Sequence, residues 1–186
     1  QLELRKELYY TAILSFSLDA GETKNIRHDL DPKFGHMNIS SSLSDVNITI
    51  DGKKFGKTPL TQLKLLSGRH EVTAVKDLYH PYSATYDIGD GEEKNIEVTL
   101  KEAFGKMSIT TSPEKGAEIF VDGQKRGVTP FVFDPCPSGK YLIEVKKQYY
   151  NPVTDQVTVT DGADVKRTLI LSPNVGTLVV KALNAS

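Results

Sequence analysis

The sequence lacks residues on which several protein classes depend. It has one cysteine and no tryptophan among 186 residues, and 23 basic side chains nearly balance 24 acidic ones. A single cysteine, Cys136, excludes an intrachain disulfide and a cysteine cluster for zinc, so we expect it to be a small buried hydrophobe. Because the charges nearly cancel, the chain has no strong positive field to attract nucleic acid. We therefore expect no nucleic-acid partner.

Long apolar runs are also missing. No stretch reaches the roughly 18 apolar residues that a membrane-spanning helix needs. Gln1 leads directly into an alternating segment, without the charged start and apolar centre of a signal peptide. We expect any membrane attachment to come only through a longer parent protein.

Signals for catalysis and for metal binding are missing as well. The histidines His28, His36, His70 and His80 are scattered, whereas zinc needs three or four converging donors. No serine lies in a Gly-x-Ser-x-Gly elbow, and Gly56-Lys57-Thr58 is followed at once by proline rather than by a phosphate-binding helix. We expect no catalytic residues, no metal and no cofactor, and therefore no enzyme.

An internal repeat is the strongest positive feature. Residues 34–40 (FGHMNIS) recur as residues 104–110 (FGKMSIT), and later segments recur at an offset of 71 residues. These later pairs are Ile50-Asp51-Gly52 with Val121-Asp122-Gly123, Thr58-Pro59 with Thr129-Pro130, Ser67-Gly68-Arg69 with Ser138-Gly139-Lys140, and Asp90-Gly91 with Asp161-Gly162. The repeat predicts four parts: 1–34, the back half of one unit; 35–104 and 105–175, two complete units; and 176–186, the opening strand of another.

Apolar residues that alternate with polar ones predict strands in each complete unit. In the first they are Val46, Ile48, Ile50, Val72, Ala74, Tyr82, Ala84, Tyr86, Ile88, Ile96, Val98 and Leu100. The second unit repeats the pattern, except that Asp155 and Arg167 take apolar positions, which we expect at strand ends or edges. Turn residues about every ten residues favour a small sandwich or barrel. The four Asp-Gly pairs are typical of tight hairpins.

These motifs resemble the PEGA domain, a small β-sandwich repeat of bacterial and archaeal envelope proteins. The second complete unit carries Gly105, Pro113-Glu114-Lys115-Gly116-Ala117, Val121-Asp122-Gly123, Gly127-Val128-Thr129-Pro130, Ser138-Gly139-Lys140 and Tyr149-Tyr150. The first has Leu43-Ser44-Asp45 in place of the namesake motif. The resemblance implies an all-β fold of tandem small antiparallel β-sandwich repeats, transthyretin-like or immunoglobulin-like. It also implies an extracytoplasmic location, in the periplasm or at the cell surface, and it implies no chemistry.

Three hypotheses for function remain. The first is a non-catalytic structural or adaptor segment of a larger cell-envelope protein, acting as a spacer or as a protein-interaction array. The second is a carbohydrate or cell-wall binding module, in which Tyr79, Tyr82, Tyr149 and Tyr150 contact the ligand. The same rings are also compatible with packing against the core. The third is an accessory domain of an envelope enzyme. The expected partner is a protein or an envelope polysaccharide.

The junctions between units are short, and an aromatic residue ends each of the first two. Phe34 follows Asp31-Pro32-Lys33, and Phe104 follows Lys101-Glu102-Ala103. Because such linkers are too short to be flexible tethers, we expect Phe34 and Phe104 to pack against a neighbouring repeat. The incomplete end units, 1–34 and 176–186, are expected to contact the adjacent repeat or another copy of the chain.

Overall fold

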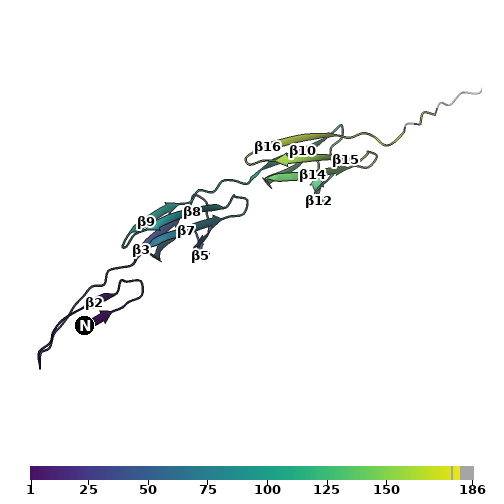
Figure 1. The fold of residues 1–186 in the computed structure, drawn as a ribbon. Helices are drawn as coiled ribbons and strands as arrows, with labels where there is room; N and C mark the ends of the chain where they lie inside the picture. The colour runs from purple at the N-terminus through teal and green to yellow at the C-terminus, as the bar shows by residue number, and fades with distance from the viewer. Residues whose placement is uncertain (177, 181–186) are drawn as a thin grey trace, which may run out of the picture. The chain divides into compact units, whose positions relative to one another are not determined.

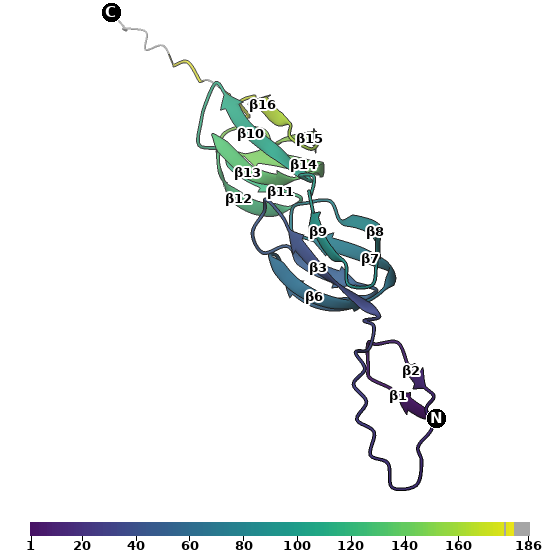
Figure 2. The same ribbon diagram turned by 90° about the vertical axis from the view of Figure 1, so that its left-hand side faces the viewer.

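The computed structural model describes residues 1–176 and 178–180, and every regular element in them is a β-strand. The chain divides into two compact units, residues 1–101 and the residues from 102 onward (Figures 1 and 2). The all-β prediction is confirmed. Of the predicted opening strand 176–186, residues 177 and 181–186 lie outside the described residues.

The first unit begins with a small hairpin. Strand β1 (Leu2–Leu4) pairs antiparallel with β2 (Ala12–Leu14). An isolated bridge then joins Tyr9 to Pro32, just before the first complete repeat.

The first complete repeat contains seven strands in two sheets. They are β3 (Phe34–Ser40), β4 (Asn47–Ile50), β5 (Lys53–Lys57), β6 (Leu60–Leu66), β7 (Gly68–Val75), β8 (Tyr82–Ile88) and β9 (Glu93–Glu97). One sheet has the order β6-β3-β9 and the other has the order β5-β4-β7-β8. Buried residues from both sheets, Met37, Ile48, Val72 and Ile96 among them, form one cluster. The repeat is therefore a sandwich.

The second repeat has the same construction. Its strands are β10 (Phe104–Ser112), β11 (Glu118–Val121), β12 (Gln124–Val128), β13 (Phe131–Pro137), β14 (Gly139–Lys146), β15 (Val153–Val159) and β16 (Asp164–Ile170). The sheets run β13-β10-β16 and β12-β11-β14-β15. Cys136 is fully buried in the core between them, as predicted.

One strand pair in each repeat is parallel, which the prediction of antiparallel sheets did not include. Strand β3 pairs in parallel with β9, and β10 pairs in parallel with β16. Because β8 and β9 lie in different sheets, Asp90-Gly91 connects the two layers and closes no hairpin. The hairpin prediction was wrong for that pair and for Asp161-Gly162. It is confirmed for Asp51-Gly52, where both residues have positive φ as a type I′ turn requires.

The glycine at the second position of strands β3 and β10 is required by close packing. A Cβ on Gly35 would lie 2.7 Å from the carbonyl oxygen of Gly89 and 2.8 Å from that of Glu92. On Gly105 it would lie 2.6 Å from the carbonyl oxygen of Ala163. The layer-to-layer connection thus passes directly over the first strand, where only glycine leaves room for it.

Candidate functional site

The predicted contact tyrosines of the first repeat lie against its core. Tyr79 and Tyr82 are partly buried and pack on the apolar cluster. The hydroxyl of Tyr82 lies 2.6 Å from that of Tyr86, four residues along β8. Burial, together with that hydrogen bond, raises the pKa of Tyr86 to about 12. These rings contribute mainly to packing, although one edge of Tyr82 lines a shallow hollow of about 230 Å³.

Tyr149 and Tyr150 occupy the turn between β14 and β15 in the second repeat. Tyr149 is 61% exposed and has a φ of 67°, and Leu8 and Leu78 hold the same turn position with φ values of 65° and 68°. The turn therefore fixes the backbone conformation at this position, while the exposure differs: Leu78 is 36% exposed. Tyr150 packs partly against the core and forms an isolated bridge with Pro173.

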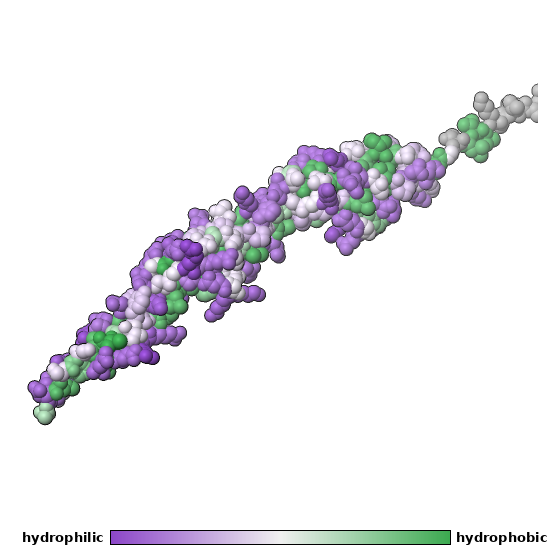
Figure 3. Space-filling model, in the orientation of Figure 1, coloured by the Kyte–Doolittle hydropathy of each residue, from purple (hydrophilic) through white to green (hydrophobic). Residues whose placement is uncertain are grey.

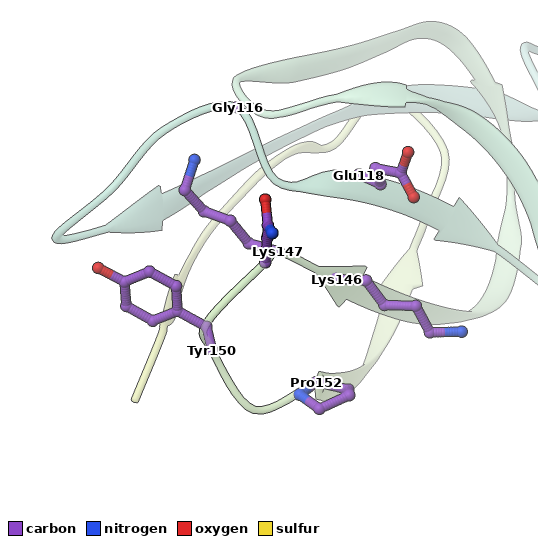
Figure 4. Close-up of a pocket in the computed structure, with 7 residues that line it drawn as sticks. Gly116, Glu118, Lys146, Lys147, Tyr150 and Pro152 are labelled. Atoms are coloured by element: carbon purple, nitrogen blue, oxygen red, sulfur yellow. The ribbon is translucent and has the colours of Figure 1, made fainter. Parts of the chain in front are cut away.

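A hollow of about 490 Å³ lies beside Tyr150 (Figure 4). Its lining comes from the start of β11, the end of β14 and the turn that follows: Gly116, Glu118, Lys146, Lys147, Gln148, Tyr150 and Pro152. Figure 4 shows Lys147 and Tyr150 on one side of the hollow and Glu118 and Lys146 on the other. An aromatic edge, an amide, two ammonium groups and the Glu118 carboxylate thus border one open site.

The charged groups of the hollow are already held by neighbours. Lys147 donates to the carbonyl oxygen of Lys115 at 2.7 Å, and Lys76 donates in the same way to Ser44 at 2.8 Å in the first repeat. The lysine at this position therefore braces the loop in both repeats. Lys146 pairs with Glu144 at 2.9 Å, and its ammonium lies 4.7 Å from the centre of the Phe120 ring.

The corresponding positions of the first repeat carry the opposite charge balance. They are Asp45, Asn47, Val75, Lys76, Asp77, Tyr79 and Pro81. One lysine and two aspartates replace the two lysines and one glutamate of the second repeat. The two repeats thus share the backbone of this region but not its surface chemistry.

The first junction is built from side chains of both flanking segments. The Phe34 ring is 7% exposed and meets Tyr9 edge to face, with 5.5 Å between ring centroids. Lys64 covers the Phe34 ring at 4.2 Å. Phe104, the counterpart of Phe34, is half-buried at the start of β10, and its carbonyl accepts from the Gly162 amide at 2.7 Å.

Sequence reasoning missed two features. The lysines of the hollow were not singled out, since the pairing that places them together is not visible in the local pattern. His70 was set aside as one of four scattered histidines, yet its ring and the Tyr141 hydroxyl each bond the carbonyl four residues earlier. The sequence signal that could have identified this position is that both repeats place a ring able to form hydrogen bonds, His70 or Tyr141, at the same core-facing position.

Within residues 1–176 and 178–180, no three histidine, cysteine or acidic side chains are grouped so as to hold a metal ion. In the same residues no helix is long and apolar enough to cross a membrane. The visible surface is mainly hydrophilic, with separate apolar spots (Figure 3).

Two sandwiches with the same strand order, joined by short linkers, define a tandem β-sandwich repeat protein. The chain belongs to the PEGA domain family, whose model matches residues 34–103 and 104–174. None of the curated proteins compared with the chain matches it.

Solved structures similar to the chain include the following two. The Bacillus anthracis TIE protein aligns with a TM-score of 0.41 and 19% identity, over 82% of this chain and 36% of that one. A Streptococcal ancillary pilin aligns with a TM-score of 0.35 and 10% identity, over 86% of this chain and 70% of that one. The chain spans about a third of the length of the Bacillus anthracis protein.

Proposed function

We propose that the chain is a non-catalytic, extracytoplasmic spacer or adaptor segment of a larger cell-envelope protein. The observation that carries the proposal is that the two repeats share their internal bracing and differ in their surface side chains. Thr58 and Thr129 are both buried, and each exchanges hydrogen bonds with the residue before the second strand. A site used by both repeats would instead share its exposed polar groups.

The linkers support a spacing role. The Lys33 amide donates to the Leu8 carbonyl at 2.8 Å before the first sandwich, and the Asn174 amide donates to Tyr149 at 2.9 Å after the second. Ser67 and Ser138 each donate a backbone bond into the linker in front of their sandwich. A linker that is hydrogen-bonded on both sides has fewer conformations than a free chain of the same length. We therefore expect it to keep the segments that it joins at a more constant separation.

The location is tested by fractionation of cells that make the parent protein. Mass spectrometry of cytosolic and envelope fractions should detect peptides of this chain in the envelope, and intact cells treated with protease should distinguish the surface from the periplasm. A parent protein found only in the cytosol would overturn the proposed location.

A second candidate is carbohydrate binding, which the hollow beside Tyr150 favours. An aromatic edge beside ammonium and amide groups is suited to an acidic sugar. Lys146→Val and Gln148→Asp import the residues of the first repeat without touching the core. If a glycan array detects binding and this double variant loses it, the hollow is the site. Lack of binding to any envelope polymer would remove this candidate.

A further inference from the structure

His70 bridges the two sheets of the first repeat. Its ring is on the core-facing side of β7, in line with the buried Val72, and its side chain is 11% exposed. Nδ1 lies 2.6 Å from a carboxylate oxygen of Asp51, in the turn between β4 and β5. Nε2 lies 2.7 Å from the carbonyl oxygen of Leu66, at the end of β6. We call these three residues the latch.

Both partners of the ring are hydrogen-bond acceptors. A neutral imidazole has one N–H, so it can satisfy only one of them and turns a lone pair toward the other. The imidazolium has two N–H groups and satisfies both. The geometry of the latch therefore fits the protonated ring, with Asp51 ionised.

The second repeat keeps the carbonyl half of this bracing, from a ring that does not titrate near neutral pH. Tyr141 holds the position of His70, and its hydroxyl donates to the Pro137 carbonyl at 2.6 Å. Burial, with the neighbouring Cys136 and Asp122, raises the pKa of Tyr141 to about 12. In each turn the aspartate accepts from the strand opposite: Asp51 from the Glu71 amide at 2.9 Å, and Asp122 from the Leu142 amide at 2.8 Å.

We propose that protonated His70 fastens the end of the first sandwich, so that the first repeat loosens as the pH rises through the neutral range while the second does not. The latch joins the turn of one sheet to the last residue of β6 in the other. Leu66 is paired with Phe34, where the linker enters, and the Ser67 amide donates to the Lys33 carbonyl at 3.2 Å. Release of the ring thus acts at the junction end of the repeat.

The ionisable neighbours on β7 and β8 have partners of their own. Arg69 faces Asp87 at 3.7 Å. Glu71 accepts from the Ser83 hydroxyl at 2.8 Å. Tyr86, directly opposite His70, is bonded to the neighbouring tyrosine on β8.

The remaining neighbours are cationic or lack ionisable groups. Lys64 is the ionisable residue of β6 and covers the Phe34 ring. Strand β5 carries Lys53, Lys54 and Lys57, while β4 carries none. Asp51 is thus the charged group bonded to the ring.

The direction of the pH effect follows from the two pKa shifts. Burial alone lowers the pKa of His70, but the hydrogen bonds to Asp51 and Leu66 outweigh it and raise the pKa above its ordinary value of 6.5. The stabilisation is therefore complete below the unfolded-state pKa and is lost as pH rises through the folded-state pKa. Hydrogen bonds from His70 and the Glu71 amide lower the pKa of Asp51, so its contribution is lost only in acid.

The test is hydrogen exchange of the full chain at about pH 5.5 and about pH 8.5, on either side of the ordinary histidine pKa. The protection factor of the Glu71 amide should fall at the higher pH, while that of Leu142 stays constant. His70→Tyr, which imports the solution of the second repeat, should abolish the fall. The reciprocal Tyr141→His should transfer it to Leu142.

An NMR titration of the His70 ring provides a second readout that needs no variant. Each unit by which the folded-state pKa exceeds the unfolded-state value predicts a tenfold loss of protection where exchange requires unfolding of the repeat. A ring that titrates at or below the ordinary histidine pKa would overturn the proposal. So would a wild-type Glu71 protection factor that is independent of pH, or a pH dependence retained in His70→Tyr.

Discussion

Arg167 pairs with Asp155 across the open side of the second sandwich, with 3.8 Å between Nε and Oδ2. Arg167 lies on β16 and Asp155 on β15, the edge strands of the two sheets. Both residues take core-facing positions, opposite the buried Ile109 and Ile143. The prediction that edge strands carry these charges is confirmed.

In the first repeat the same two positions hold Ala84 and Ile96. The same strand arrangement thus accepts either two apolar residues or an ion pair. The charged side chains are 36% and 50% exposed, so the pair contributes less than about 1 kcal/mol. We expect Asp155→Ala alone to destabilise by about that amount. The free energy of unfolding of the double variant Asp155→Ala/Arg167→Ile, measured in urea, should equal that of the wild type or exceed it by about 1 kcal/mol. The reason is that an apolar isoleucine is buried in place of the charged pair.

A double variant less stable than Asp155→Ala would show that the ion pair does more than close the edge of the sandwich. We expect the double variant to be more stable than that, because Ile96, the isoleucine at the same position of the first repeat, is buried at 5% exposure.

Gly105→Ala should destabilise the second repeat by about 1–3 kcal/mol, because the new methyl group would meet two carbonyl oxygens. These oxygens, of Ala163 and Thr160, would lie 2.6 and 2.8 Å from the Cβ. Gly139→Ala is the matched control, since its nearest neighbour would be 3.9 Å away. Equal thermal midpoints for the two variants would contradict the packing role assigned to Gly105.

Thr129→Val should lower the free energy of unfolding by about 1–3 kcal/mol, although valine has nearly the same shape as threonine. The reason is that the buried Ala117 amide loses its acceptor. Thr129 is 2% exposed, accepts from the Ala117 amide at 3.1 Å, and bonds the Thr111 hydroxyl at 2.7 Å. The exposed Thr158→Val should change the free energy of unfolding by less than about 0.5 kcal/mol. Denaturant titrations of both variants would decide, and a cost no larger than that of the control would refute the bracing role.

Tyr149→Asn should leave the free energy of unfolding unchanged or raise it by about 1 kcal/mol, because asparagine adopts the left-handed conformation more easily. Tyr149→Val should lower it, since a β-branched residue is strained at a φ of 67°. Calorimetry of the two variants gives the comparison. If asparagine proves as costly as valine, the tyrosine ring rather than the turn dominates at this position.

The sequence predicted the features that depend on neighbouring residues in the chain, above all which strand residues are buried. Alternation located Ile48, Val72 and Val145, and these three residues are buried. It did not predict the parallel pairing of β3 with β9, because sheet membership depends on contacts between distant segments. For the same reason Asp90-Gly91 was taken for a hairpin. The latch was missed because the local pattern does not show that the ring at this position bonds the carbonyl four residues earlier.

The central claim, that the repeats hold a distance, is tested most directly by small-angle X-ray scattering. The intact chain should give a narrow distribution of lengths. Phe104→Ala should broaden it, because the counterpart Phe34 packs edge to face on Tyr9 at the first junction. Ile170→Ala, at a side chain that is 67% exposed, should not. An intact chain as variable as two freely linked sandwiches, or a Phe104→Ala profile identical to the wild type, would contradict the spacer account.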